Sequence, residues 1–286
     1  MIKNLFALAV VVTVIAACQP TKEAKTETKA PTLTMKWESD TLLTTCESVL
    51  YDKTNDVLYV ADIAGKPDSA DGVGYIAKLG LDGKIVDAQW VKGLNAPKGM
   101  GQSNGKLYVA DLTNLVEIDI ATGAVTTTYP VEGASFLNDV TVDGAGKVYV
   151  SDSNTGNVHV LENGAVTTYL TGVAGVNGLL ADGDTFLVAS FSGGTLNTVD
   201  ASKQVVLKAD SVENADGIEA VGDGGYLVSS WNGKVTYVAP DGTTTKLIDT
   251  TADQVSAADI EYIADKKLLL VPTFFKNKVV AYELTN

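Results

Sequence analysis

Apolar and polar residues alternate over short stretches along most of the chain, a pattern typical of β-strands. A run of apolar residues with small or acidic residues near its end recurs about every 40 residues, a spacing typical of propeller blades. The six copies are LYVADI (58–63), LYVADL (107–112), VYVSDS (148–153), FLVASF (186–191), YLVSSW (226–231) and LLVPTF (269–274). Long apolar stripes with helical periodicity are absent after residue 31, which argues against α/β sheets and helical solenoids.

Each copy is followed by a second strand led by Gly or Asn, and several of these strands contain Asp-Gly, Asn-Gly or Thr-Gly turns. Each repeat is therefore expected to be a four-stranded antiparallel sheet. Six such sheets are best closed radially, so the sequence predicts an all-β fold, a six-bladed β-propeller. The sixth repeat stops after its third strand at Leu284. We expect the extended stretch 32–39 (TLTMKWES) to complete this blade and to close the ring by pairing the two chain ends.

The N-terminal residues MIKNLFALAVVVTVIAACQ have the pattern of a secretory signal, with a basic residue, a short apolar run and small residues before Cys18. The apolar run is too short for a retained spanning helix. Ile15-Ala16-Ala17-Cys18 resembles the bacterial lipobox, which predicts lipidation of Cys18 and membrane attachment through the acyl chains. An ordinary signal peptide with a cysteine at its cleavage site is the alternative.

These features predict a lipoprotein signal peptide over 1–17, a flexible tether over 18–31 and one propeller domain over 32–286. The protein is then expected in the bacterial cell envelope. Gln19, rather than Asp, follows the cysteine, which favours the outer over the inner membrane by analogy with lipoprotein sorting.

The chain is acidic, with 21 basic and 35 acidic residues and a net charge of −14, and every basic residue is Lys. A nucleic-acid partner is excluded because phosphate contacts need a basic face. With Cys18 lipidated, Cys46 has no cysteine partner, and we expect it to be a buried or semi-buried structural residue; a nucleophile is the alternative. We expect a monomer that acts on a small molecule.

Polar residues with oxygen-bearing side chains stand at the start of the predicted inner strand in five of the six repeats. In a propeller these strands run beside the central channel, so their first side chains should converge near the axis. The five residues are Glu47, Asn138, Asn177, Asp216 and Asp259. The second repeat has Lys98 near this position; this residue either contacts a substrate oxyanion or is solvated at the rim.

Carboxylate and carboxamide oxygens suit a hard cation, so Glu47, Asn138, Asn177 and Asp216 are candidate calcium ligands. Magnesium or another divalent cation stays an alternative. Zinc is disfavoured because the one histidine, His159, has no cysteine partner and is expected to be a surface or packing residue. The competing interpretation is that these Asn and Asp side chains only make local turn bonds.

On these motifs, the chain from Thr32 to its end resembles the senescence-marker-protein/gluconolactonase family of six-bladed propellers, which includes lactonases and the squid-type diisopropyl fluorophosphatase. The family motifs are a Glu before the first inner strand, then Asn-Asp, Asn-Gly and Asp-Gly in blades three to five. They match Glu47, Asn138-Asp139, Asn177-Gly178 and Asp216-Gly217. The resemblance implies that Glu47, Asn138, Asn177 and Asp216 hold a divalent cation, usually calcium, below the substrate pocket.

The resemblance is incomplete where the family binds sugars. Val49 and Val140 replace a family Pro and Gly, and 135–137 (SFL) replace a segment that contains a basic residue in sugar-lactone hydrolases. The metal motif is retained, whereas aldonolactone specificity is not implied. Asp259 is a candidate additional ligand or a second carboxylate in the pocket.

The hypothesis is a calcium-dependent hydrolase of lactones or related esters, with the cation as Lewis acid and Asp216 as base or nucleophile. A serine triad is excluded because a single histidine is present and no G-x-S-x-G element precedes a helix. One alternative is a non-catalytic binding propeller on the cell surface, similar to NHL or low-density-receptor propellers, with a structural ion on its axis. A strictosidine-synthase-like or organophosphate-hydrolysing relative is another.

Overall fold

The computed structural model describes Met1 and residues 30–285. Residues 2–17 of the predicted signal peptide, the lipidation site Cys18 and the tether up to residue 29 lie outside the described residues, so they stay predictions. Within the described part of the chain, no helix is long and apolar enough to span a membrane.

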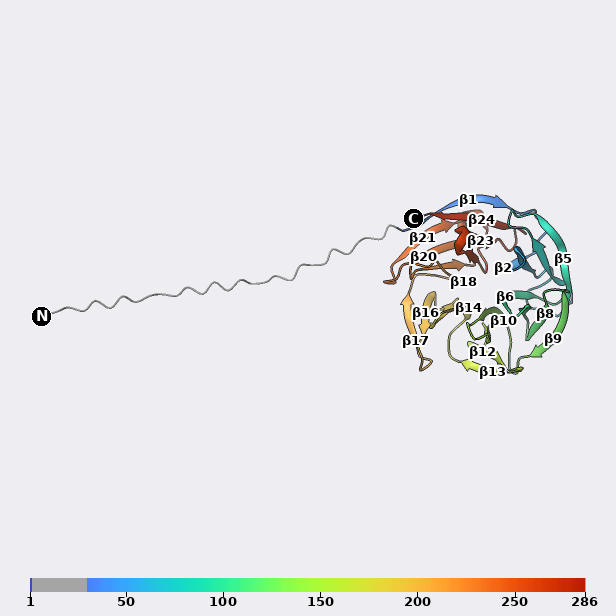
Figure 1. The fold of residues 1–286 in the computed structure, drawn as a ribbon, viewed down its shortest axis with the longest axis horizontal. Helices are drawn as coiled ribbons and strands as arrows, with labels where there is room; N and C mark the ends of the chain where they lie inside the picture. Colours follow the sequence, from blue (N-terminus) through green and yellow to red (C-terminus); the bar gives the residue numbers. More distant parts are fainter. Residues whose placement is uncertain (2–29, 286) are drawn as a thin grey trace.

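The described chain forms six four-stranded antiparallel sheets arranged as the blades of a β-propeller (Figure 1). Blade 1 contains β2 (Cys46–Asp52), β3 (Val57–Asp62), β4 (Gly74–Leu79) and β5 (Ile85–Leu94). Blade 2 contains β6 (Pro97–Ser103), β7 (Lys106–Asp111), β8 (Asn114–Asp119) and β9 (Ala124–Pro130). Blade 3 contains β10 (Leu137–Val142), β11 (Val148–Asp152), β12 (Asn157–Glu162) and β13 (Ala165–Leu170).

Blade 4 contains β14 (Val176–Asp182), β15 (Thr185–Ser190), β16 (Thr195–Val199) and β17 (Val205–Ala209). Blade 5 contains β18 (Ala215–Ala220), β19 (Tyr226–Ser230), β20 (Lys234–Val238) and β21 (Thr244–Asp249). Blade 6 contains β22 (Glu261–Ile263), β23 (Leu268–Pro272), β24 (Val279–Thr285) and β1 (Thr32–Glu38). Two 3₁₀ turns, η1 (Thr251–Asp253) and η2 (Ala264–Lys266), complete the described elements. The predicted fold class is confirmed.

The hydrophobic core is divided into clusters that lie between neighbouring blades. On β3, Leu58 and Val60 pack in the cluster shared with blade 6, whereas Tyr59 and Ala61 pack in the cluster shared with blade 2. Successive side chains of a strand point to opposite faces, so one second strand serves two interfaces. This double burial explains why the recurring motif is continuously apolar rather than alternating.

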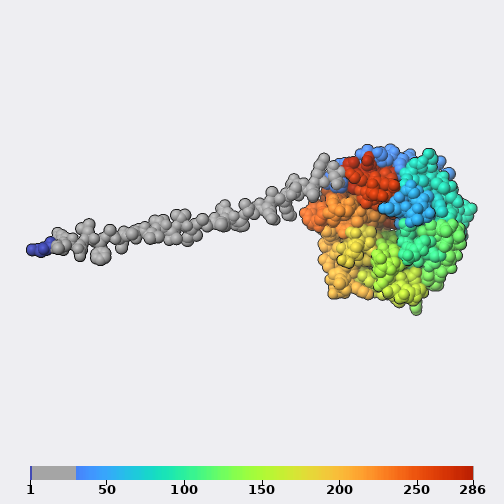
Figure 2. Space-filling model, viewed as in Figure 1, coloured from blue at the N-terminus to red at the C-terminus, as the bar shows by residue number. Residues whose placement is uncertain are grey.

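The ring is closed by its two ends, as predicted. The strand β1 pairs antiparallel with β24, with Thr32 opposite Thr285. In the space-filling view the blue N-terminal strand lies against the red C-terminal segment (Figure 2). Leu33 packs on the cluster between blades 5 and 6, and Trp37 on the cluster between blades 6 and 1. The closing strand therefore secures the interfaces on both sides of blade 6.

Cys46 and the single histidine, His159, both pack in the protein interior. Cys46 is fully buried, and burial, with a smaller effect from Asp62, raises the pKa of its thiol to about 12. This confirms the expected structural role. His159 on β12 is also buried, its Nδ1 lies 3.5 Å from Thr168 Oγ1, and burial lowers its pKa. It is a packing residue.

Candidate functional site

The inner strands of blades 1 to 5 each contain a β-bulge near their first residues. The bulge falls at Glu47 in β2, at Lys98-Gly99 in β6, at Asn138-Asp139 in β10, at Asn177-Gly178 in β14 and at Asp216-Gly217 in β18. A bulge releases residues from the regular ladder and changes the direction of their side chains. The Asn-Gly pair that suggests a hairpin turn in isolation is thus a bulge at the head of a strand.

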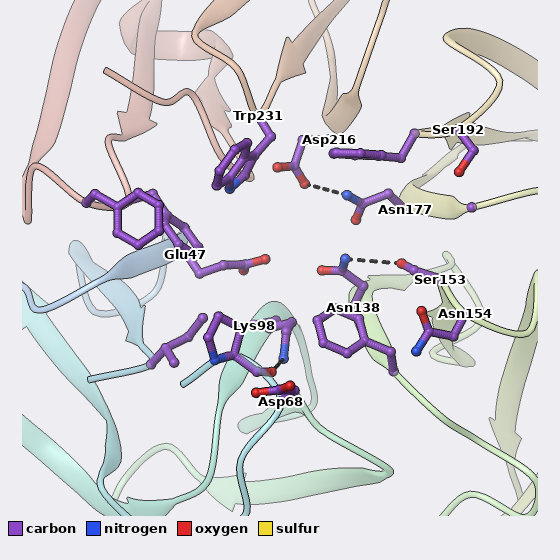
Figure 3. Close-up of a pocket in the computed structure, with 17 residues that line it drawn as sticks. Glu47, Asp68, Lys98, Asn138, Ser153, Asn154, Asn177, Ser192, Asp216 and Trp231 are labelled. Atoms are coloured by element: carbon purple, nitrogen blue, oxygen red, sulfur yellow. Dashed lines mark hydrogen bonds between the residues drawn. The ribbon is translucent and has the colours of Figure 1, made fainter. Parts of the chain in front are cut away.

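The bulges direct four of the predicted residues into one cavity of about 560 Å³ at the propeller axis. Glu47, Asn138, Asn177 and Asp216 are buried, with exposed fractions of 3–8%. Figure 3 shows their polar ends pointing toward a common centre. Four residues far apart in the sequence are therefore brought together by equivalent positions in four blades.

Hydrogen bonds orient the two carboxamides. Asn177 Nδ2 donates to Asp216 Oδ1 at 2.9 Å, and Asn138 Nδ2 donates to Ser153 Oγ at 3.1 Å (Figure 3). With its nitrogen used in this way, each amide presents its oxygen toward the centre. Two buried oxygens of the set, Glu47 Oε2 and Asn177 Oδ1, have no hydrogen-bond partner. A buried polar atom without a partner is costly, so these oxygens are suited to a cation.

The cavity holds two buried carboxylates, Glu47 and Asp216, whose charges Lys98 only partly compensates. Burial and the nearby Asp216 carboxylate raise the pKa of Glu47 well above its ordinary value, while Lys98 opposes the shift. Burial and Asp139 raise the pKa of Asp216 to about 8, and the hydrogen bond from Asn177 opposes it. A divalent cation would favour the ionised form of both groups and would satisfy both orphaned oxygens.

The residues therefore fit a hard divalent cation. Among the described residues no three His, Cys, Asp or Glu side chains gather as a ligand group. The axial set instead combines two carboxylates with two carboxamides, which are the oxygen ligands that calcium accepts. This set contains no histidine or thiol, the ligand types that zinc prefers.

Close packing between inner strands explains the glycines that follow the ligands. A Cβ on Gly178 would collide with the backbone oxygen of Asp216 on the next strand, and a Cβ on Gly217 would collide with Asp259. The backbone angles of Gly178 lie outside the positive-φ region, so glycine is required here by the approach of the strands.

Lys98 lies in the cavity wall and is not solvated. Its side chain is 2% exposed, so the rim alternative is wrong. Nζ donates to the carbonyl oxygens of Pro67 and Ala96, each at 3.0 Å, and lies 4.4 Å from the ring centre of Phe136. Burial lowers the pKa of Lys98, while Glu47 and Asp111 act in the opposite direction. The 66–68 loop, which follows no repeat pattern, is what covers this side chain.

Asp259 is not brought into this cavity. Its backbone N–H donates to Glu47 O, but its carboxylate accepts from Ser48 Oγ at 2.7 Å and lines a second cavity of about 240 Å³ further along the inner strands. That second cavity also contains Asp139, Glu219 and Glu261. Burial raises the pKa of Asp139 to about 6 and that of Glu261 to about 7.

The aromatic wall of the axial cavity was missed by the sequence reasoning. Its side chains include Phe136, Phe191, Trp231, Phe274 and Phe275. Three of them, Phe191, Trp231 and Phe274, occupy the last position of the recurring apolar motif. That shared position was the available signal, because a residue at the end of the second strand in every blade must reach the same end of the ring.

The fold and the axial site define a six-bladed propeller with a candidate cation centre in its channel. No protein-family model and no curated protein sequence matches the chain. Solved structures do match. A catalytically inactive virginiamycin B lyase from Staphylococcus aureus with quinupristin is similar at 12% identity and a TM-score of 0.62, over 90% of this chain and 99% of that one.

Two further solved structures have the same architecture. A gluconolactonase-like protein matches at 14% identity and a TM-score of 0.64, over 89% of this chain and 92% of that one. A luciferin-regenerating enzyme matches at 15% identity and a TM-score of 0.65, over 90% of this chain and 96% of that one. At these identities the likeness establishes the six-bladed fold.

Proposed function

We propose that the protein is a calcium-dependent hydrolase of lactones or related esters. The observation that carries the proposal is the convergence of Glu47, Asn138, Asn177 and Asp216 in one cavity, with two of their buried oxygens left without partners. The named solved structures of similar fold are enzymes, which adds support to an enzymatic role. Another divalent cation remains compatible with the same ligands.

The four axial side chains would hold calcium, and when bound it would supply Lewis-acid polarisation of the substrate carbonyl oxygen. Asp216 has Oδ1 engaged by Asn177 and would take a proton from the attacking water at Oδ2. The water oxygen then bonds to the carbonyl carbon as the carbon–oxygen ester bond breaks. The proton held by Asp216 passes to the departing alkoxide. Direct attack by the Asp216 carboxylate is the alternative route.

Lys98 would act beside this centre. Two of its three N–H groups are used by backbone carbonyls, which fixes the position of the ammonium in the wall. The remaining N–H is available to an oxygen of the substrate, where its charge would stabilise developing negative charge. The apolar wall limits water at the reacting carbonyl.

The test combines metal analysis with a substrate panel. We expect the purified protein to bind calcium stoichiometrically and to hydrolyse some lactones or esters with calcium but not with chelator. Full activity in chelator would exclude the metal mechanism. Tight calcium binding without turnover of any lactone or ester, in both the unmodified protein and Asp216→Asn, would favour the non-catalytic binding propeller instead.

A further inference from the structure

The wall of the axial cavity is built from one equivalent position in successive blades. Ile63, Ser153, Phe191, Trp231 and Phe274 follow the second strands of five blades and all line the cavity. The equivalent residue of blade 2 is Leu112, which packs against the cluster that contains Ile63 and Phe274 but is not among the residues that line the cavity. Five of the six positions therefore carry large apolar side chains, and four of the five, Ile63, Phe191, Trp231 and Phe274, line the cavity beside the candidate cation centre.

Aromatic side chains extend this surface to the mouth of the cavity. The rings of Trp231 and Phe274 lie 5.6 Å apart, and those of Phe274 and Phe275 lie 4.7 Å apart, all edge to face. Phe275 is 63% exposed although it is a large apolar residue at the cavity rim. Exposed aromatic surface beside a concave site is characteristic of ligand contact.

Phe136 contributes an aromatic surface from a different blade. The backbone N–H of Phe136 donates to Asp152 Oδ1 at 3.0 Å, and that of Ser135 donates to Asp152 Oδ2 at 2.9 Å. These bonds fix the segment before β10, and Phe136 lines the same cavity as Trp231. The apolar wall is thus held by rigid elements from blades on different sides of the axis.

Three polar side chains of the wall, those of Ser153, Asn154 and Lys98, already make hydrogen bonds within the protein. Ser153 Oγ accepts from Asn138 and donates to Val176 O at 2.8 Å. Asn154 Nδ2 donates to Ser135 Oγ at 3.2 Å, and Lys98 donates to two carbonyls. A polyhydroxylated ring would bury hydroxyl groups against aromatic carbon, which is costly without hydrogen-bond partners.

The charge of the cavity disfavours an anionic substrate. Glu47, Asp68 and Asp216 line it, against the single basic side chain Lys98. A divalent cation on the axis would bring these formal charges to balance. A further anionic group on the substrate would then meet no unused positive side chain among the described lining residues.

We propose that the substrate is an uncharged lactone or ester that carries an aromatic or alicyclic ring, which packs against Trp231, Phe274 and Phe275. This inference rests on the proposed function of the same site and narrows its substrate class. Polyhydroxylated sugar lactones are correspondingly poor substrates.

The experiment compares γ-phenyl-γ-butyrolactone, unsubstituted γ-butyrolactone and gluconolactone in the presence of calcium. We expect kcat/KM to favour the phenyl lactone over each of the others by about tenfold or more, the discrimination that an apolar pocket gives a ring-sized group. Binding without turnover is measured with the matching γ-phenyl-γ-lactam, by calorimetry and by tryptophan fluorescence.

Phe275→Ser is the principal variant, since Phe275 is exposed and its replacement leaves the buried core unchanged. Leu207→Ser on β17 is a control of similar exposure, 63% for Phe275 against 59% for Leu207. Phe275→Ser should weaken lactam binding and lower the phenyl-lactone preference by about threefold or more, whereas Leu207→Ser should change neither. Trp231→Leu provides a second change in the same wall.

The outcomes separate the two proposals. Turnover of gluconolactone as efficient as that of the phenyl lactone overturns this inference and leaves the hydrolase proposal standing. If no lactone or ester is hydrolysed, the hydrolase proposal fails. In that case, lactam binding that depends on Phe275 and Trp231 still supports an aromatic ligand. An absence of lactam binding overturns the inference of an aromatic ligand.

Discussion

The close approach of the inner strands makes Gly178→Ala a direct test of how the ligand set is positioned. Gly178 has no positive φ, so alanine introduces no backbone strain and its effect is purely steric. The added methyl group would collide with the backbone oxygen of Asp216 and would lie 3.1 Å from Ile218 Cγ1. Relief of this collision requires β14 and β18 to separate by roughly 1 Å in a close-packed region.

The expected cost is that of overpacking a dense interior, about 1–3 kcal/mol of unfolding free energy. The shift also displaces Asp216 relative to Asn177, whose side chains are joined at 2.9 Å. Misplacement of a supporting contact typically lowers metal affinity about tenfold or more. We therefore expect both the stability and the calcium affinity to fall.

The assay is urea denaturation in chelator, followed by calcium titration in a calorimeter. Gly144→Ala is the matched control, because Gly144 also lacks a positive φ and a Cβ there would meet nothing within 4 Å. Gly144→Ala should leave both measurements within error of the unmodified protein. If Gly178→Ala retained normal stability and calcium affinity, the argument that strand proximity positions the site would be refuted.

Three further predictions concern the carboxylates and the ring closure. Asp216→Asn should lower kcat by about a hundredfold or more through loss of the base, and should weaken calcium binding, as measured by steady-state kinetics and calorimetry; unchanged activity would contradict its catalytic role. Burial raises the pKa of the Asp62 carboxyl well above 3.8, and both of its oxygens lack hydrogen-bond partners. The folded protein therefore keeps this proton at pH values where the unfolded chain loses it, so the free energy of unfolding should fall as the pH rises above 3.8 toward the raised value. In urea denaturation, Asp62→Asn should remove up to about 1.4 kcal/mol per pH unit from the slope of the unfolding free energy against pH, whereas Asp253→Asn at an exposed position should not. Identical slopes for the unmodified protein and both variants would refute the role given to Asp62. Removal of residues 32–38 should lower the free energy of unfolding by about 3 kcal/mol or more, because the packing of Leu33 and Trp37 is lost and the edge of β24 is exposed. Equal urea denaturation midpoints for the shortened and full chains would contradict a stabilising role of this strand.

The parts of the site that could be predicted from sequence are those that repeat with the blades. Asn177 could be placed beside Asp216 because both begin inner strands, and the missing strand of blade 6 pointed to residues 32–39. Repetition fixes position because equivalent residues of a closed ring lie at the same height along its axis.

The remaining features depend on packing that the repeat does not encode. Lys98 is buried because the 66–68 loop covers it, and Asp259 faces the second cavity because Ser48 holds its carboxylate there. Asp62 has no backbone donors, although the matching Asp111 and Asp152 each accept two or more. Identical residue types at equivalent positions of different blades therefore have different surroundings, and the local loops determine those surroundings.

The pairing of β1 with β24 also has a kinetic consequence. Thr32 and Thr285 hydrogen-bond across a sequence separation of 253 residues, so ring closure brings together parts of the chain that are far apart in sequence. Contacts of such long range are slow to form. The four axial side chains come from blades 1, 3, 4 and 5, and their common centre exists only when the blades have assembled around it. If the proposed calcium site forms, a calcium-binding signal during refolding would report the assembly of these blades around the axis, a step separate from the pairing of β1 with β24.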